Sequence, residues 1–180
     1  MSARLAMATP TFTHLHVHSH YSLLDGAIGI DALLGEAARH GMGSLALTDH
    51  GNLFGAIEFY TKARTAGINP ILGCEAYLVE GDATAPVAAG EKRVRHHVTL
   101  LARDRKGWEN LSRLSSLSWI KGFHHKPCID RRLLGQHAEG LIALSGCMSG
   151  EVAQHLLGRR LDLACRTAEE YAELLGRENF

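Results

Sequence analysis

The sequence has no excess charge of either sign, because 19 Lys and Arg residues balance 19 Asp and Glu residues. Without a net positive field to attract a phosphate backbone, any contact with nucleic acid has to be local. The four cysteines form no Cys-x-x-Cys pair, and the N-terminus has no apolar core of a signal peptide. Both absences favour a reducing, cytoplasmic setting. No apolar run approaches the roughly 18 residues that span a bilayer, so we expect no membrane contact.

Several catalytic signatures are also missing. The sequence contains no Gly-x-x-x-x-Gly-Lys phosphate loop, no Gly-x-Gly-x-x-Gly dinucleotide motif and no Gly-x-Ser-x-Gly nucleophile elbow. It also lacks an Asp-x-Asp pair, which argues against a polymerase metal site within these residues. The remaining chemistry therefore has to be sought among other side chains.

Histidine is the residue present in excess, with 12 copies in 180 residues and most of them in the first hundred. The histidines alternate with apolar residues and do not form a consecutive run, so an affinity tag does not explain them. Their positions relative to the predicted strands become the main clue to function.

Short apolar runs alternate with longer amphipathic segments, a rhythm that predicts one α/β domain of βαβα type. We predict a disordered tail over residues 1–10 and a single domain over residues 11–180. The small, polar segment 80–95 is predicted to be a loop, in which Lys92, Arg93 and Arg95 are more readily explained as solvated charges than as phosphate contacts. The predicted strands are 12–18, 44–48, 70–73, 98–102 and 141–145, and the predicted helices are 30–40, 53–66, 108–120, 151–157 and 162–175.

The first predicted strand places two imidazoles on one face. Side chains alternate along a strand, so His16 and His18 point the same way. Neutral imidazole is the commonest metal ligand, and Asp25 could return an oxygen ligand to the same end. A pair of half-buried histidines without metal is the alternative, and it would be preferred if this cluster stood alone.

Other ligand-type residues follow later strands. Asp49 and His50 come at the end of one strand, Glu75 at the end of the next and Cys147 just after another. Because parallel strands of a barrel deliver their carboxyl ends to one face, these side chains are expected to converge. The pair His96 and His97 precedes its strand, and strand direction alone does not place it.

The mixture of imidazoles, carboxylates and one thiolate suits zinc, manganese or iron better than calcium or magnesium. The candidate ligands outnumber those that one tetrahedral ion can bind, so two or three divalent ions are expected. Such clusters hydrolyse phosphate esters. The other cysteines, Cys74, Cys128 and Cys165, are interpreted as small buried residues.

Four stretches, HLHVHS with YSLLDG, LALTDHGNLFGAIEF, INPILGCEAYL and EGLIALSGCMSGEV, resemble the polymerase and histidinol phosphatase (PHP) domain at the N-terminus of bacterial DNA polymerase III alpha subunits. The resemblance extends over nearly all of the chain after Pro10. It implies a distorted (βα)7 PHP barrel, incomplete at the C-terminus because the last βα units and an Asp-x-His motif are missing. It also implies a polymerase module, with Mg²⁺, outside this chain.

The resemblance further implies a ligand set and chooses His97 over His96. Asp49 becomes a partner that orients a ligand by a hydrogen bond rather than binding metal. The implied partners are DNA, through the complete subunit, a proofreading exonuclease subunit and other replicase subunits. The implied metal ligands are His16, His18, Asp25, His50, Glu75, His97 and Cys147.

Three functions remain as hypotheses. The first is a metal-dependent phosphodiesterase, with 3′ to 5′ exonuclease proofreading as its chemistry. The second is a metal-binding or structural scaffold that docks the proofreading subunit. The third, a small-molecule phosphatase, is disfavoured by the stretches GNLFGAIEFY and GCEAY, which match the polymerase subunit.

Overall fold

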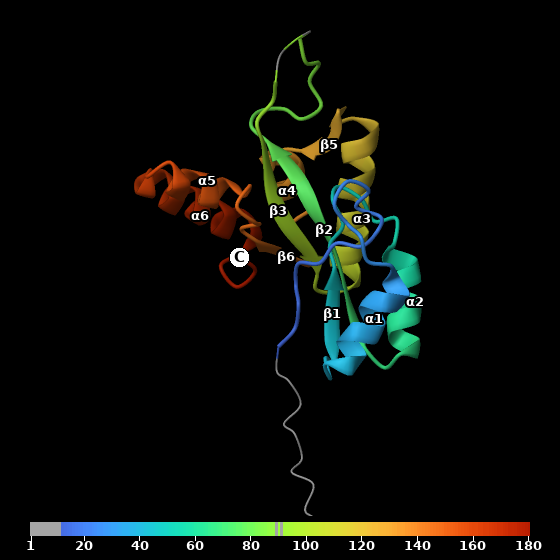
Figure 1. Ribbon diagram of the computed structural model, residues 1–180. Helices are drawn as coiled ribbons and strands as arrows, with labels where there is room; N and C mark the ends of the chain where they lie inside the picture. Colours follow the sequence, from blue (N-terminus) through green and yellow to red (C-terminus); the bar gives the residue numbers. More distant parts are fainter. Residues whose placement is uncertain (1–11, 89, 91) are drawn as a thin grey trace, which may run out of the picture.

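The computed structural model describes residues 12–180 apart from residues 89 and 91, so the predicted tail over 1–10 lies outside the described residues. Its six strands form one sheet in the order β4, β5, β2, β3, β6, with β1 also paired to β2. Figure 1 shows the long strand β2 at the centre of this sheet. The strands are β1 (Ser44–Leu47), β2 (Asn69–Val79), β3 (Arg95–Ala102), β4 (Phe123–His124), β5 (Lys126–Ile129) and β6 (Leu141–Leu144).

The sheet is mixed and open, whereas parallel strands of a distorted barrel, incomplete at the C-terminus, were expected. β1 and β5 pair with β2 in parallel, whereas β3 pairs with β2 antiparallel. The predicted loop after β2 explains the difference, because an antiparallel neighbour can be reached by a loop, while a parallel one needs a crossover. β6 is antiparallel to β3 and therefore runs parallel to β2. The carboxyl ends of β2 and β6 thus lie beside the amino end of β3.

The predicted strand over residues 12–18 is wrong. This segment runs beside β1 without regular pairing. The carbonyl of His14 accepts a hydrogen bond from the amide of Ala46 at 2.9 Å, and that of Val17 accepts one from the amide of Thr48, just after β1, at 2.8 Å. The side chain of Thr48 replaces the next ladder bond, accepting from the amide of Val17 at 2.8 Å. The hydroxyl therefore interrupts the ladder where a β-strand was expected.

The helices match the predicted apolar periodicity, with boundaries shifted by a few residues. α3 begins early because Asp104 caps it, accepting a hydrogen bond from the amide of Gly107 at 2.8 Å. The short helix α4 and the strands β4 and β5 were not predicted. The helices are α1 (Ile30–Arg39), α2 (Ala56–Thr65), α3 (Arg105–Ile120), α4 (Arg131–Gln136), α5 (Glu151–Leu157) and α6 (Leu161–Leu175).

Two hydrophobic clusters hold these elements together. The smaller joins α1, β1 and α2 around Phe59, and the larger joins the rest of the sheet to α3, α4 and α6 around Leu100 and Leu134. α3 packs along β2, β3, β5 and β6, while α5 and α6 pack on each other and touch β3 and β6 (Figure 1). Among the described residues, no helix is both long enough and apolar enough to cross a membrane.

Candidate metal centre

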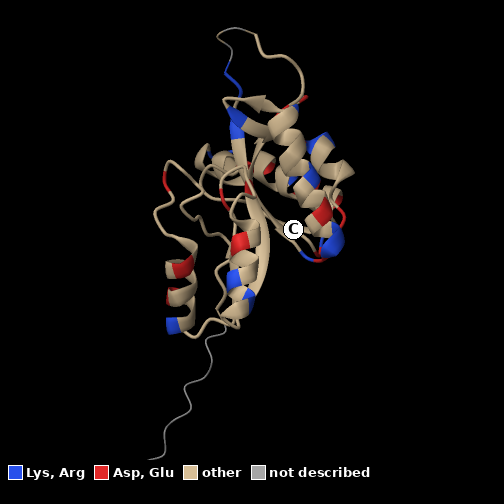
Figure 2. Cartoon of the chain, turned by 90° about the vertical axis from the view of Figure 1, so that its right-hand side faces the viewer, with Lys and Arg blue, Asp and Glu red and all other residues tan. Residues whose placement is uncertain are grey.

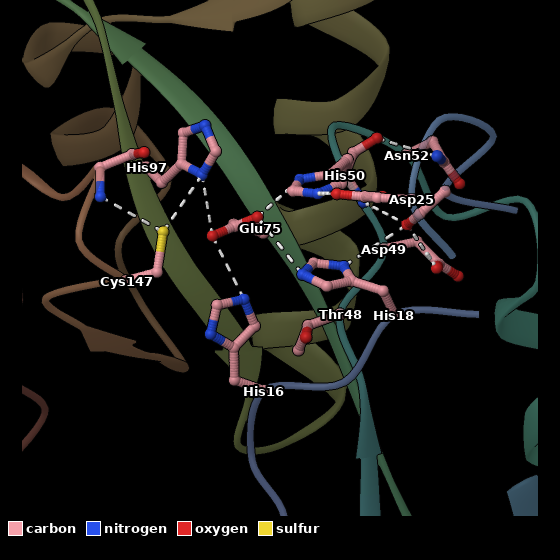
Figure 3. Close-up of polar contacts among 12 residues, drawn as sticks. His16, His18, Asp25, Thr48, Asp49, His50, Asn52, Glu75, His97 and Cys147 are labelled. Carbon is pink, nitrogen blue, oxygen red and sulfur yellow. Dashed lines mark hydrogen bonds and ion pairs between the residues drawn. The ribbon is translucent and has the colours of Figure 1, made fainter. Parts of the chain in front are cut away.

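A buried carboxylate, Glu75 in β2, lies at the centre of the site. Its side chain is 1% exposed and four imidazoles surround it (Figure 3). Oε1 lies 3.2 Å from His16 Nε2 and 3.0 Å from His97 Nδ1. Oε2 lies 3.5 Å from His18 Nε2 and 2.6 Å from His50 Nδ1.

Strand alternation explains why Glu75 faces the histidines. Cys74 and Ala76 line a small cavity with Leu111 and Leu114 of α3, so the side chains between them in sequence point to the other face of the sheet. The thiol of Cys74 is fully buried, and burial raises its pKa to about 12, so it is the small buried residue that was expected.

The register of β3 selects one member of the histidine pair. His97 stands opposite Tyr77, on the same face as Glu75, whereas His96 stands opposite Leu78 on the other face. Because β3 is antiparallel to β2, its first residues reach the end of the sheet where parallel strands finish. His97, which lies within β3 and not before it, therefore reaches the same end of the sheet as His50, which follows β1.

Several atoms of this cluster are buried yet make no hydrogen bond within the described part of the chain. They are both carboxylate oxygens of Glu75, Nε2 of His16 and Nδ1 of His50. Buried polar atoms normally have partners, because an unpaired one costs free energy. These nitrogen and oxygen atoms lie close together without forming hydrogen bonds, which is typical of ligands that bind the same cation. The groups His16, His18, Glu75 and His50, Glu75, His97 each bring their ligand atoms within 4.8 Å, and Glu75 belongs to both.

The electrostatics favour a charged carboxylate. Burial alone would raise the pKa of Glu75, but the imidazoles of His16, His50 and His97 hold that pKa far below its ordinary value. The pKa of His50 is raised, chiefly by its contact with Glu75 and also by Asp25, against the opposing effect of burial. Burial and the neighbouring His50 lower the pKa of His18.

Two further predicted ligands lie at opposite edges of the cluster. The carboxylate of Asp25 is 2.9 Å from His50 Nε2, and this contact lowers its pKa. Sγ of Cys147 is 3.5 Å from His97 Nδ1. The residue before Cys147, Gly146, has a φ of +82°, and a Cβ there would overlap the carbonyl of His97. Glycine thus lets the loop after β6 approach β3 closely.

The loop after His18 is held by a carboxylate that does not touch the histidines. Asp49 accepts hydrogen bonds from the amide and hydroxyl of Ser19, at 2.7 and 2.9 Å, and from the hydroxyl of Ser22 at 2.8 Å. Ser22 Oγ lies 3.4 Å from His18 Nδ1 and accepts from the amide of His50 at 3.1 Å. Asp49 was expected to bond a ligand directly, and its hydrogen bonds reach the ligands through Ser22. Sequence reasoning missed both serines, which are 0% and 2% exposed.

Comparison with known proteins identifies the family. The profile of the PHP domain matches residues 14–180. The chain belongs to the PHP domain family. The resemblance noted in the sequence is thereby confirmed over nearly the whole chain.

The curated relatives of this PHP domain are alpha subunits of DNA polymerase III. The subunit from Saccharopolyspora erythraea is 44% identical over 193 residues, which cover 97% of this chain and 16% of the relative. The subunit from Thermus aquaticus is 46% identical, covering 92% of this chain and 14% of the relative. That from Helicobacter pylori strain 26695 is 47% identical, covering 81% and 12%. This chain therefore spans about a seventh of the length of these subunits.

Solved structures resemble this PHP domain only distantly. An amidohydrolase from Chromobacterium violaceum is 27% identical with a TM-score of 0.38, covering 58% of this chain and 34% of its own. A candidate metal-dependent phosphoesterase from Bifidobacterium adolescentis is 17% identical with a TM-score of 0.38, covering 87% and 57%. Likeness at this level adds nothing to the assignment.

A third group of ligand-type residues in the PHP domain has a structural role. The carboxylate of Glu80, the imidazole of His96 and the carboxylate of Glu151 also lie within 4.8 Å of one another. Glu151 already accepts two hydrogen bonds from Arg131, at 2.9 and 2.8 Å, and one from the hydroxyl of Tyr171 at 3.1 Å. The charge of Glu151 is neutralised by a guanidinium, so Glu151 ties α5 to α4 and α6.

Replacing Asp49 by Asn should loosen the loop that positions His18. The amide has one acceptor oxygen where the carboxylate uses two, so at least one serine hydroxyl loses its partner. We expect metal affinity to fall about tenfold, the lower end of the effect of losing a partner that orients a ligand. Isothermal titration with Zn²⁺ measures this. Asp31→Asn, an exposed change on α1, is the matched control, and equal affinity in both variants would contradict the role of Asp49.

Proposed function

We propose that this PHP domain binds two or three divalent metal ions of the zinc, manganese or iron class and hydrolyses phosphodiesters. The buried carboxylate of Glu75 supports this most directly, because its oxygens face four imidazoles and lack hydrogen bonds among the described residues. Because Glu75 belongs to both ligand groups, it would help to hold more than one ion. The proposed ligands are His16, His18, Asp25, His50, Glu75, His97 and Cys147.

The ions would activate water and neutralise the phosphoryl oxygens. The chain's own contribution is to hold the ligands in place. The Asp49 and Ser22 hydrogen bonds fix the loop between His18 and Asp25, and the parallel pairing of β1 with β2 sets His50 beside Glu75. Tyr77, beneath His50, stays protonated because burial raises its pKa to about 12, so it adds no negative charge to the pocket.

Similarity to alpha subunits of DNA polymerase III supports a role for this activity in replication. We infer that the chain acts as the N-terminal PHP domain of a DNA polymerase III alpha subunit, a DNA-directed DNA polymerase of the bacterial cytoplasm whose Mg²⁺-dependent polymerase module lies outside these residues. Its partners would be DNA, the proofreading exonuclease subunit and other replicase subunits. The phosphodiesterase would then remove nucleotides in the 3′ to 5′ direction.

The test combines metal content with hydrolysis. Elemental analysis after reconstitution should give two or three equivalents of zinc, manganese or iron per chain. Nucleotide release from the 3′ end of a single strand should require the same ion. His18→Ala should reduce both the metal content and the rate by more than about tenfold, because one imidazole serves binding and hydrolysis together. His40→Ala, on the exposed end of α1, is the matched control.

Two outcomes would redirect the proposal. Full metal content with no hydrolysis under any of the three metals would favour the scaffold that docks the proofreading subunit. Equal metal content in the His18→Ala and His40→Ala variants would contradict the assignment of His18 as a metal ligand.

A further inference from the structure

Three exposed aromatic side chains beside the metal centre are not explained by metal binding. Phe54, Trp119 and Phe123 leave 62%, 41% and 52% of their surfaces exposed. They come from the turn before α2, the end of α3 and β4. The ring centroids of Phe54 and Trp119 are 5.7 Å apart, and those of Trp119 and Phe123 are 5.4 Å apart. We call these three residues the aromatic row. Contiguous exposed apolar surface of this kind marks a binding site more often than a structural one.

The aromatic row is held in a defined orientation. Nε1 of Trp119 donates a hydrogen bond to the carbonyl of Gly51 at 2.8 Å, and the Trp119 and Phe123 rings lie within 20° of parallel. The amide of Phe54 donates to Asn52 Oδ1 at 3.1 Å. Gly51 and Asn52 directly follow His50, so the same turn positions a ligand and the aromatic row. Flat rings fixed in this way can stack on another flat ring with little loss of side-chain entropy.

The aromatic row and the metal centre open into the same groove. A cavity of about 630 Å³ is lined by the aromatic row together with Asp25, His50 and His97. A molecule with a phosphate at the metal centre would therefore have its neighbouring groups within the groove that contains the rings.

Positively charged side chains line the groove and the cavity next to it. Arg95 and Lys126 line the groove. Arg95 also lines an adjoining cavity of about 570 Å³ with Lys92, Arg93 and His125, whose described lining residues include no carboxylate. Figure 2 shows basic residues in the segment that enters β3. Because the chain has no net charge, this local cluster is where a polyanion would be attracted.

We propose that the groove binds single-stranded nucleic acid, with bases stacked on Phe54, Trp119 and Phe123 and with phosphates directed toward Arg95 and the adjoining basic cavity. Rings that stack bases beside cations that contact the backbone are the two parts of a single-strand binding site. The inference rests on the proposed function and deepens it, since it names the residues that would hold the strand beside the metal centre. Stacking accepts every base, so little sequence preference is expected.

An abasic strand separates stacking from phosphate binding. Fluorescein-labelled oligothymidylate and an abasic strand of equal length carry the same phosphates, and anisotropy with the Zn²⁺-loaded chain compares their affinities. We expect the base-bearing strand to bind about tenfold more tightly. Phe123→Ala and Phe54→Ala should remove most of that preference. Ile120→Ala, 78% exposed beside Trp119 but outside the lining of the groove, should keep it.

Tryptophan fluorescence gives a second readout. Only Trp108 and Trp119 are present, so Trp108→Phe leaves emission from Trp119 alone. The base-bearing strand should quench that emission, and the abasic strand should not. Equal affinity for both strands, or unaltered preference in Phe123→Ala, would overturn the inference and would point to a protein partner on the aromatic row.

The outcomes also distinguish the inference from the proposed function. If the chain binds both strands equally and hydrolyses them at equal rates, the proposed phosphodiesterase activity is supported and base stacking in the groove is contradicted. If the chain binds the base-bearing strand more tightly but hydrolyses neither strand, base stacking in the groove is supported and the phosphodiesterase activity is contradicted.

Discussion

Glu75→Gln should lower the affinity for the first metal ion by more than about 100-fold, beyond the effect of losing an orienting partner. The amide has nearly the same shape as the carboxylate, so packing around β2 changes little. Its charge is lost, and one of the two oxygens becomes an NH₂ donor that faces imidazole nitrogen atoms. Both ligand groups contain Glu75, so both should weaken together. Isothermal titration with Zn²⁺ and Mn²⁺, beside elemental analysis, measures the change.

The control is Glu109→Gln, which alters an exposed carboxylate on α3 that pairs with Arg105. Its metal affinity should equal that of the parent chain. Circular dichroism checks that both variants are folded. Metal bound by Glu75→Gln with parental affinity would contradict a shared carboxylate at the centre of the site.

The same substitution should change the acid stability of the metal-free chain. The pKa of Glu75 is depressed in the folded state relative to an ordinary value of 4.5, so its contribution to stability is fully present above about that pH and is lost as pH falls below it. Glu75→Gln removes the titrating group and should flatten this part of the profile of unfolding free energy against pH. Parallel acid profiles for the two chains would count against the assigned charge state.

Gly26→Ala should be the most damaging small substitution near the site. A Cβ on Gly26 would overlap the carbonyl oxygen of Ser19, a backbone atom that cannot move aside as a side chain could. That carbonyl accepts from the amide of Ser22, whose hydroxyl bridges Asp49 and His50. We expect a loss of about 1–3 kcal/mol in the free energy of unfolding, as for an overpacked interior. Metal affinity should fall with it, because the loop holds Asp25.

Gly35→Ala is the matched control, because a Cβ at that position on α1 meets no atom within 4 Å. Replacing glycine by alanine inside a helix stabilises by about 0.4–1 kcal/mol, so the two substitutions should change stability in opposite directions. Urea unfolding of the metal-free chains measures the free energies, and Zn²⁺ titration measures the affinities. A Gly26→Ala chain as stable as Gly35→Ala would show that the turn can open without cost.

Much of the local structure was predictable because it depends on neighbours in sequence. Apolar spacing located α1, α2, α3, α5 and α6, and the placement of His50, Glu75 and Cys147 after strands indicated that they would converge. The parallel direction of β1 and β2 brings His50, just past the end of β1, beside Glu75, which lies within β2 and not after it as predicted. These inferences needed only periodicity and chain direction.

Tertiary structure decided the rest, because strand pairing and side-chain contacts join residues that are distant in sequence. The antiparallel pairing of β3 with β2 set His97 opposite Tyr77 and turned His96 away, a choice that strand order alone could not make. Residues 12–18 do not pair regularly with β1, because the amide of Val17 donates to the hydroxyl of Thr48 and not to a backbone carbonyl. The aromatic row assembled from three segments up to 69 positions apart, from Phe54 to Phe123. The sequence by itself determined which side chains could bind metal. Only the folded sheet decided which of them lie around Glu75.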